Sequence, residues 1–544
     1  MRTATGRGTD ETGATGQAGD SGTAAQTSGT TPTGTSGEAG SPGPTRTPAP
    51  SAETRQTGER PGPPGLNPRG RKAAVRYGLL ALAAVAACAG AVFGVDGLGT
   101  PGRVTLAVFA VATLLWMFSP IDDTYVALAA GLVLVTAGAL EADVLFGSLG
   151  DPTIWLLICA FVLAAGVTRT GLATRAAAFF VAGARTVRQL AHLTTAALVA
   201  GAFAIPATSG RAALALPVFL ALAGALRERR RVVLALALIF PAVILLSAVA
   251  TLIGAGAHLI TAEMVAQATG HRIGFVQWLL LGTPPAIVSA HLATEVILLL
   301  TTTRADRRLP VSVRAEDVGA AAGVRVTGRL TDHQARSAAL LAVVVVLWCS
   351  EPLHGVPPAV VALVGAVVSC SPLLGTVRLG ESLKTVPWSM LLFMAATMAM
   401  GVALTTSGAA AWITGGLFAR SGGAPPPAWL FLGGVVAVST LAHLVLQSRS
   451  ARSSVLVPLV MTAALGAGIS PVAAAFASTA AAGFCLTLPS SAKPVALFHG
   501  IEDVPTYTPR DLLRVSAVLA PLTAALVLAF ALYVWPLLGL PVTR

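Results

Sequence analysis

The sequence predicts an all-α membrane protein with about eleven transmembrane helices and two re-entrant hairpins. Hydrophobic residues make up 54% of the chain and charged residues only 11%, and the mean hydropathy is +0.75. A water-soluble fold of this size could not cover its surface with so few polar groups. Apolar runs of roughly 18 residues or more recur from about 75 to 538, each long enough for the ~30 Å hydrocarbon core.

Residues 1–72 differ from the rest because Gly, Thr, Ser and Pro dominate them. They cannot bury enough apolar surface to fold, so we interpret them as a disordered cytoplasmic tail. The net charge of +12 does not indicate a nucleic-acid partner, because outside the tail Lys and Arg lie mainly in short loops, where they set membrane topology. The cysteines show no Cys-x-x-Cys spacing, so we expect neither a metal cluster nor a disulfide framework.

The first membrane half is expected over 73–302, with the N-terminus in the cytoplasm because basic residues precede the first apolar run. Its expected spans are 77–97, 103–118, 124–140, 152–168 and 277–302, with a broken helix at 232–260. The segment 189–226 has basic residues on both sides and a polar break from Pro206 to Arg211. Each of its arms would reach only ~22 Å, so we predict a re-entrant hairpin.

A cytoplasmic linker, 303–336, is rich in arginine and leads to the second membrane half, 337–544. Its expected spans are 337–350, 356–373, 386–405 and 512–538. The C-terminus is expected on the extracytoplasmic side of the cell membrane. A second hairpin is predicted at 427–468, with its polar centre from Gln447 to Arg452, and a second broken helix at 470–500.

The two halves contain an internal repeat. When the hairpin centres are aligned on Pro217 and Pro458, Ser209 matches Ser450 and Arg211 matches Arg452. Each hairpin is followed by an interrupted span, at Gly254-Ala-Gly-Ala-His258 and at Pro489-Ser-Ser-Ala-Lys-Pro494. Hairpins that enter from opposite faces form an inverted repeat, which in secondary transporters places the binding site at the repeat interface with helix N-termini directed at an anion.

Several stretches resemble the divalent anion/sodium symporter family, whose members carry sulfate or di- and tricarboxylates. The similarity covers about 100–540 and includes Trp116-Met-Phe-Ser-Pro-Ile, Gly150-Asp-Pro-Thr-Ile-Trp155, Thr170-Gly-Leu172, Thr251-Leu-Ile-Gly254 and Phe275-Val-Gln-Trp278. The resemblance implies a homodimer in which a transport domain moves against a scaffold domain as an elevator.

This chain departs from the family at its sodium-site motifs. The family's hairpin tips carry Ser-Asn-Thr, whereas this chain has Ala207-Thr-Ser and Ser448-Arg-Ser, and its only asparagine is Asn67. His258 and Val495 stand where the broken helices of the family carry asparagine. A sodium site of the family's type therefore cannot be carried over intact, and no other cofactor or metal is expected.

The candidate substrate-binding residues are cations and hydroxyls at the two tips and the two breaks. They are Thr208, Ser209, Gly210, Arg211, His258, Ser448, Arg449, Ser450, Arg452, Ser490, Ser491 and Lys493. Guanidinium groups match the oxygens of carboxylate, sulfate or phosphate, and arginine at membrane depth needs such compensation. We hypothesise that fixed cations replace sodium, so that transport is an exchange or is proton-coupled, with His258 as the candidate titrating group.

The function expected is therefore a secondary active transporter of a small anion in the cell membrane. A non-transporting anion sensor on the same fold is the alternative from another class, and an enzyme is not expected because no nucleophile triad or phosphate loop occurs. Arg211 and Arg452 have an alternative structural role as snorkelling or paired side chains, and His258 as a structural residue. Asp122 and Asp123 are expected to be solvated or paired with nearby arginines, and for Glu295 pairing within the scaffold is favoured over a role in a proton relay.

Overall fold

The computed structural model describes residues 90, 94 and 96–543, apart from 420–425. This part of the chain contains no strand, and its β pairing is limited to two isolated bridges, Thr186 with Pro310 and Ile469 with Thr543. The all-α membrane fold predicted from the composition is confirmed. The predicted tail (1–72) and most of the first predicted span (77–97) lie outside the described residues.

Seven helical segments of the described chain are long and apolar enough to cross a membrane, and five shorter apolar helices accompany them. The long segments are α2 (Thr100–Phe118), α4 with α5 (Ala142–Arg169), α8 (Thr208–Ala225), α9 with η2 (Arg230–Ala250), α11 (Phe275–Thr301), α18 (Trp388–Thr406) and α24 with η6 and η7 (Pro509–Leu538). The shorter ones are α3 (Asp123–Thr136), α6 (Leu172–Ala182), α16 (Pro358–Ser369), α20 with η4 (Ala428–Leu444) and α22 (Pro471–Ala481). The count of about eleven spans stays a prediction, because length and composition do not decide which shorter helices cross the bilayer.

The remaining helices connect these segments or pack between them. They are α7 (Val187–Ala204), α10 (Gly256–Thr269), α12 (Arg304–Arg308), α13 (Ala315–Ala321), α14 (Asp332–Cys349), α15 (Glu351–His354), α17 (Leu379–Lys384), α19 (Ala409–Ala419), α21 (Arg449–Gly466) and α23 (Lys493–Leu497). Helix α19 follows α18, and the shorter apolar helix α6 follows α5, at places where the sequence predicts only loops. At 11 residues each, they are too short to span the bilayer, so apolar runs of span length do not predict them.

Each predicted hairpin consists of two helices with a short break between them. In the first, α7 ends at Ala204 and α8 begins at Thr208. In the second, η4 ends at Leu444 and α21 begins at Arg449. The aligned prolines lie inside α8 and α21, downstream of each break. That the two hairpins enter the membrane from opposite faces stays a prediction.

The two interrupted helices share one backbone conformation at their breaks. In the first, η3 (Leu252–Gly254) is flanked by Thr251 (φ −131°, ψ 151°) and Ala255 (φ −157°, ψ 148°). In the second, η5 (Pro489–Ser491) is flanked by Leu488 (φ −124°, ψ 150°) and Ala492 (φ −159°, ψ 148°). Because unrelated loops rarely coincide in this way, the match supports an internal repeat that includes the backbone.

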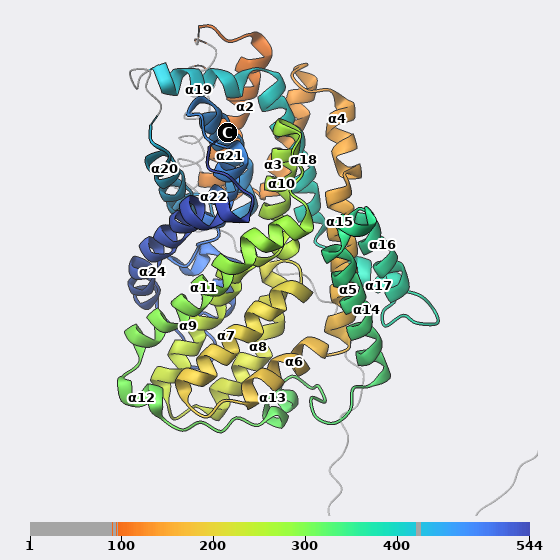
Figure 1. The fold of residues 1–544 in the computed structure, drawn as a ribbon, viewed down its shortest axis with the longest axis vertical. Helices are drawn as coiled ribbons and strands as arrows, with labels where there is room; N and C mark the ends of the chain where they lie inside the picture. Colours follow the sequence, from red (N-terminus) through yellow and green to blue (C-terminus); the bar gives the residue numbers. More distant parts are fainter. Residues whose placement is uncertain (1–89, 91–93, 95, 420–425, 544) are drawn as a thin grey trace, which may run out of the picture. The chain divides into compact units, whose positions relative to one another are not determined.

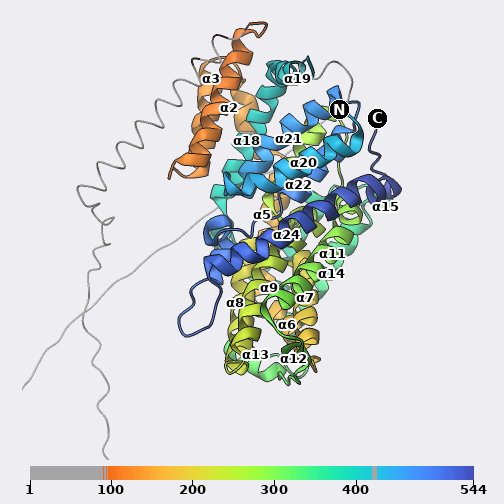
Figure 2. The same cartoon turned by 90° about the vertical axis from the view of Figure 1, so that its left-hand side faces the viewer.

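Two hydrophobic clusters make up the core of the described chain. One includes buried residues of α2, α3, α5, α10, α16, α18, α21 and α22, and the other includes residues of α6 to α9, α13 and the segment 484–519. Helix α11 contributes Phe275 and Trp278 to the first and Ala290 and Ile297 to the second. Figure 1 shows α6 to α9, α12 and α13 gathered in the lower part of the ribbon, and Figure 2 shows the same grouping from the side.

Helix α11 also holds the first break in place. The Trp278 indole donates a hydrogen bond to the Val249 carbonyl (3.0 Å), and the Thr283 hydroxyl donates to the Ala250 carbonyl (3.2 Å). Between these side chains, Gly282 lets the two backbones approach so closely that a Cβ atom there would lie 2.0 Å from the Val249 oxygen. The break is therefore supported by neighbouring helix contacts, as irregular backbone inside a membrane requires.

We expect Gly282→Ala to destabilise the protein by about 2 kcal/mol or more, because the new methyl group would meet backbone that cannot move aside cheaply. Thermal unfolding of the purified protein in detergent would measure the change. Gly224→Ala is the matched control, since a Cβ at Gly224 meets no atom within 4 Å and should leave the midpoint unchanged or slightly raised. Equal midpoints for the two variants would contradict the close approach of α11 to the break.

Candidate functional site

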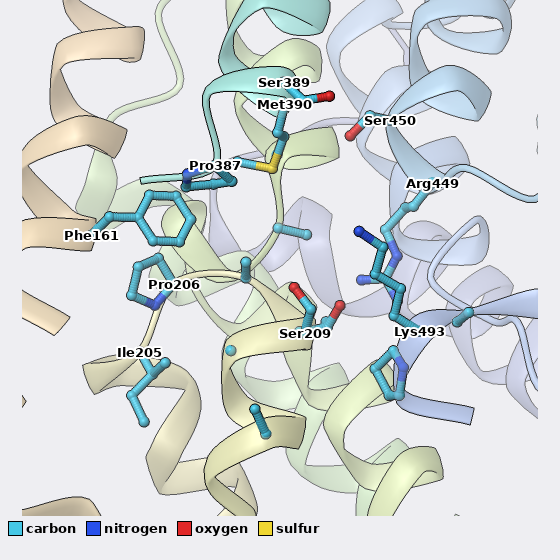
Figure 3. Close-up of a pocket in the computed structure, with 18 of the residues that line it drawn as sticks. Phe161, Ile205, Pro206, Ser209, Pro387, Ser389, Met390, Arg449, Ser450 and Lys493 are labelled. Carbon is cyan, nitrogen blue, oxygen red and sulfur yellow. The ribbon is translucent and has the colours of Figure 1, made fainter. Parts of the chain in front are cut away.

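A cavity of about 1020 Å³ opens where the two hairpin tips and the two broken helices meet. Its wall contains residues from the breaks of both repeats and from the N-terminal ends of α3 and α18. In Figure 3, Arg449, Ser450 and Lys493 lie on one side of this space, and Ser209, Pro206 and Phe161 lie around the rest of it. The structure therefore brings together segments that are far apart in the sequence.

The first hairpin tip contributes the N-terminal turn of α8. Thr208, Ser209 and Gly210 all line the cavity, so the first backbone N–H groups of α8, which have no partner within the helix, lie at its wall. Ala207, just before the helix, has a backbone φ angle of +64°, which residues other than glycine rarely adopt. Such backbone strain commonly occurs at functional sites, where the surrounding structure maintains it.

The second hairpin tip contributes the N-terminal turn of α21. Ser448 caps this helix by accepting a hydrogen bond from the backbone N–H of Ala451 (3.3 Å), and Ser448, Arg449 and Ser450 line the cavity. Nη2 of Arg449 donates to the carbonyls of Gly483 (3.0 Å) and Leu245 (3.4 Å). Its Nη1 atom is buried and has no hydrogen-bond partner among the described residues, so its hydrogen bonds are left unmade in this conformation.

The two breaks contribute unequally to the cavity. The first break supplies Ala255, Gly256 and Ala257, which bring backbone but no polar side chain. The second supplies Ser490, Ser491 and Lys493 together with the start of α23. The cationic and hydroxyl side chains are therefore concentrated in the second repeat, an asymmetry that the aligned sequences already contain.

Arg211 and Arg452 hold the ends of the interrupted helices at matching positions. Arg211 donates to the Ser247 hydroxyl (2.9 Å) and to the Ile244 carbonyl (3.0 Å), near the end of α9. Arg452 donates to the Phe484 carbonyl (3.4 Å) and to the Cys485 sulfur (3.4 Å), just after α22. Both side chains are buried, and no ion pair with a carboxylate is found for either within the described chain.

These two arginines lie differently with respect to the cavity. Arg452 is part of the wall although it is fully buried, whereas Arg211 lies behind the wall and lines a separate apolar pocket. Each satisfies carbonyls at the C-terminal end of a half-helix, where the helix dipole is negative. Arg211 therefore contributes charge and support to the site without touching the main cavity.

His258 also lies outside the wall of the main cavity. It is buried, its Nδ1 atom lies 3.0 Å from the Thr251 carbonyl oxygen, and its ring stacks on Trp278 with the centroids 5.1 Å apart. A neutral imidazole that donates to this carbonyl needs no further partner at that atom. The surroundings favour the structural role considered above over that of a titrating group in contact with a substrate.

Three acidic residues line the same cavity and were not among the predicted site residues. Asp122 caps α3 by accepting from the backbone N–H of Thr124 (2.9 Å), and the carboxyl group of Asp123 lies near the Ser448 side chain. Glu381 pairs with Lys384 at 2.8 Å. An Asp-Asp pair directly before an apolar run in a charge-poor chain is the signal that could have identified the first two. Asp122 is exposed, as expected for a solvated carboxylate, and neither aspartate forms an ion pair with an arginine among the described residues.

The cavity has a positive lining where the hairpin tips meet. Helices α8, α10 and α21 begin at its wall, and the positive ends of their dipoles add to the charges of Arg449, Arg452 and Lys493. No salt bridge joins these three cations to a carboxylate in the part of the chain that the structure describes. Such an arrangement can bind an anion through charge-assisted hydrogen bonds from guanidinium, ammonium, hydroxyl and backbone N–H groups.

Comparisons with known proteins agree with this architecture. The model of a family described as "sodium:sulfate symporter transmembrane region" matches residues 74–540. A protein of Cupriavidus necator described as "membrane protein" is 25% identical over 492 residues, which cover 86% of this chain and 94% of that protein.

Two solved transporter structures have a similar fold. The YdaH transporter of Alcanivorax borkumensis superposes with a TM-score of 0.51 at 15% identity, over 82% of this chain and 100% of that chain. MtrF of Neisseria gonorrhoeae, described as illuminating a class of antimetabolite efflux pumps, has a TM-score of 0.55 at 12% identity, over 82% and 97% of the two chains. At these identities the similarity concerns the fold alone.

Proposed function

From the premise that this chain belongs to the sodium:sulfate symporter family, we propose that it is a secondary carrier of a small anion, of the sulfate or di- and tricarboxylate class, working by alternating access. The observation that carries the proposal is the cationic cavity at the two hairpin tips, where Arg449 keeps a buried Nη1 atom without a protein acceptor. A bound oxyanion would accept from Lys493 and, after a small turn of the guanidinium toward the cavity, from this atom, while the hydroxyls of Ser209 and Ser450 complete its hydrogen bonds.

The proposed carrier does not depend on sodium. Carbonyl groups at the ends of interrupted helices are the ligands that coordinate sodium or take part in proton coupling in secondary transporters. Here Arg211 and Arg452 donate to such carbonyls, of Ile244 and Phe484, which supports the proposal that each guanidinium replaces a bound cation. Transport would then proceed as an exchange of anions or with protons as the coupling ion.

The proposal includes an orientation and an assembly. Helices α6, α12 and α13 lie together at one end of the ribbon, and the described chain ends at the opposite end (Figures 1 and 2). The arginines on and around these helices, such as Arg175, Arg304 and Arg308, support a cytoplasmic location for that end by the positive-inside rule. The C-terminus would then be extracytoplasmic, and we propose a homodimer in the cell membrane.

Uptake into proteoliposomes tests this function. We expect saturable uptake of at least one of labelled sulfate, succinate and citrate, at the same rate whether external sodium is present or replaced by choline, because the guanidinium groups are always charged. Strict dependence on a sodium gradient would rule out the fixed-cation hypothesis. Saturable binding without flux would instead identify the alternative, an anion sensor on the transporter fold.

A further inference from the structure

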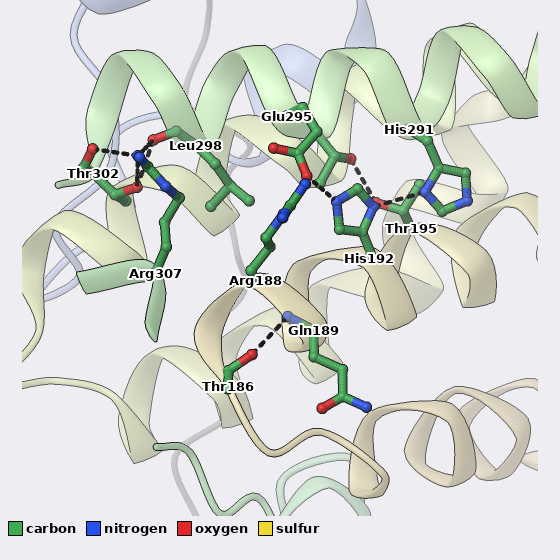
Figure 4. A network of polar contacts seen from close by, with 11 residues as sticks. Thr186, Arg188, Gln189, His192, Thr195, His291, Glu295, Leu298, Thr302 and Arg307 are labelled. Atoms are coloured by element: carbon green, nitrogen blue, oxygen red, sulfur yellow. Dashed lines mark hydrogen bonds and ion pairs between the residues drawn. The ribbon is translucent and has the colours of Figure 1, made fainter. Parts of the chain in front are cut away.

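A second polar cluster, remote from the cavity wall, connects the hairpin arm α7 to α11 (Figure 4). The Nδ1 atoms of His192 and His291 are 2.8 Å apart, and the two rings stack with their centroids 5.1 Å apart. Nε2 of His192 lies 2.6 Å from Oε1 of Glu295, and Nε of Arg188 lies 2.6 Å from the same oxygen. The cluster therefore joins two helices through four titratable side chains.

The short contact between the two histidines limits how many protons the pair can hold. His192 donates its Nε2 proton to the Glu295 carboxylate, so the two facing Nδ1 atoms share a single proton between them. With this bond intact, the pair is either neutral or carries one positive charge. A second charge would place a hydrogen on both Nδ1 atoms, and these would repel each other. The doubly protonated pair therefore requires the contact to open.

The charged groups that face the pair are Glu295 and Arg188, on α11 and α7 themselves. Arg307 on α12 turns to the carbonyls of Leu298 (3.2 Å) and Thr302 (2.9 Å) instead, and Arg175 on α6 turns to the carbonyl of Arg329 (3.3 Å). The buried stretch of α9 that packs on α7 is entirely apolar. Helix α14 meets α11 near Phe275, and the buried face of α24, which packs on α11, carries no charged side chain. Thr195 and Thr294, beside the pair, form a hydrogen bond to each other at 2.6 Å.

The position of the cluster relates it to the hairpin tip. Helix α7 runs from Arg188 and His192 directly to the break that precedes Thr208 and Ser209 at the cavity wall. We propose that His192 and His291 form a proton-binding site that holds α7 against α11 near neutral pH and releases it in acid, so that the first hairpin responds to pH. The consequence for transport rests on the proposed function, whereas proton binding and the release of α7 do not.

Hydrogen exchange followed by mass spectrometry tests the site without any substrate. After correction for the intrinsic pH dependence of exchange, we expect peptides from 187–204 to exchange at least about fivefold faster at pH 5.0 than at pH 7.5, because the second proton separates the two Nδ1 atoms and the opened arm loses protection. His291→Gln, which cannot take up the second proton, should remove this difference. His333→Gln, at an exposed position on α14, is the control and should retain it.

A second variant keeps both histidines. Glu295→Gln removes the carboxylate that favours protonation of His192, and it should shift the midpoint of the transition to lower pH by about one unit or more. Corrected exchange in 187–204 that is independent of pH in the wild type would overturn the proposal. So would the same transition, at the same midpoint, in Glu295→Gln and in the wild type. Failure to observe uptake would count against the proposed carrier. It would not bear on the proton site, which the exchange experiments test separately.

Discussion

Replacing Arg449 with glutamine is expected to weaken anion binding, and with it saturable uptake, by about a hundredfold or more. Its Nη1 atom is buried without an acceptor in the described protein, while Nη2 is engaged by the Gly483 and Leu245 carbonyls. The guanidinium is thus oriented by the protein before an anion arrives. Removing one partner of a buried, hydrogen-bonded charge pair typically costs 2–5 kcal/mol, and about 1.4 kcal/mol corresponds to a factor of ten.

Two further variants make the Arg449 result specific. Arg449→Lys keeps the charge but loses the two-pronged geometry, so its affinity should lie between those of the wild type and of the glutamine variant. Arg336→Gln, on the exposed side of α14, should leave the affinity unchanged. The measurement is a thermal-shift titration with sulfate, succinate and citrate, followed by uptake of the anion that responds. A glutamine variant with wild-type affinity would remove Arg449 from the binding site.

Replacing Arg452 with glutamine is expected to weaken anion binding by about tenfold or more and to make the remaining affinity depend on sodium. The first effect follows from losing a charge in the cavity wall, where an interaction over several ångströms is worth on the order of 2 kcal/mol. The second follows because the Phe484 carbonyl loses its cationic donor, while the Gln amide is neutral. A small cation can then occupy the end of the interrupted helix.

The comparison that isolates the charge is Arg452→Lys, which should remain insensitive to sodium and close to the wild type in affinity. Isothermal titration of each variant with the responding anion, in sodium chloride and in choline chloride, measures both effects. If Arg452→Gln binds the anion as tightly as the wild type, the guanidinium serves only to satisfy carbonyls. If its affinity falls but is the same in both salts, the fixed-cation hypothesis fails for this repeat.

The fold class and the family follow from features that are local in the sequence. The apolar run lengths and the scarcity of charge dictate a helical membrane protein, because only helices satisfy every backbone group within such a segment. Polar residues inside apolar runs predict the breaks at Pro206 to Arg211 and at Gln447 to Arg452. In the structure, one helix ends and the next begins at each of these places. The short helices α6 and α19 are not predicted from the sequence, because each is shorter than an apolar run that spans the bilayer.

The residues that line the cavity can be predicted only in part from the sequence. The hydroxyls and cations at the tips, among them Ser209, Ser450 and Arg449, carry their own signal because polar groups are costly in lipid. The Asp122-Asp123 pair gives a weaker signal and Glu381 gives none, because carboxylates outside apolar runs are normally solvated. They belong to the cavity because α3 packs against α18 and α17 packs against α5, and residues of all four helices line it.

The sequence by itself determined the membrane class, the family, the repeat and the concentration of cations at two matched breaks, since each depends on composition or on residues close together in the chain. Only the tertiary structure decided which of those cations face the cavity. Arg449 and Lys493 do, whereas Arg211 is turned to the end of α9 and His258 is stacked on Trp278. The physical reason is that an arginine among apolar helices can donate its hydrogen bonds either to orphan carbonyls or to an anion, and the geometry of distant segments selects between them.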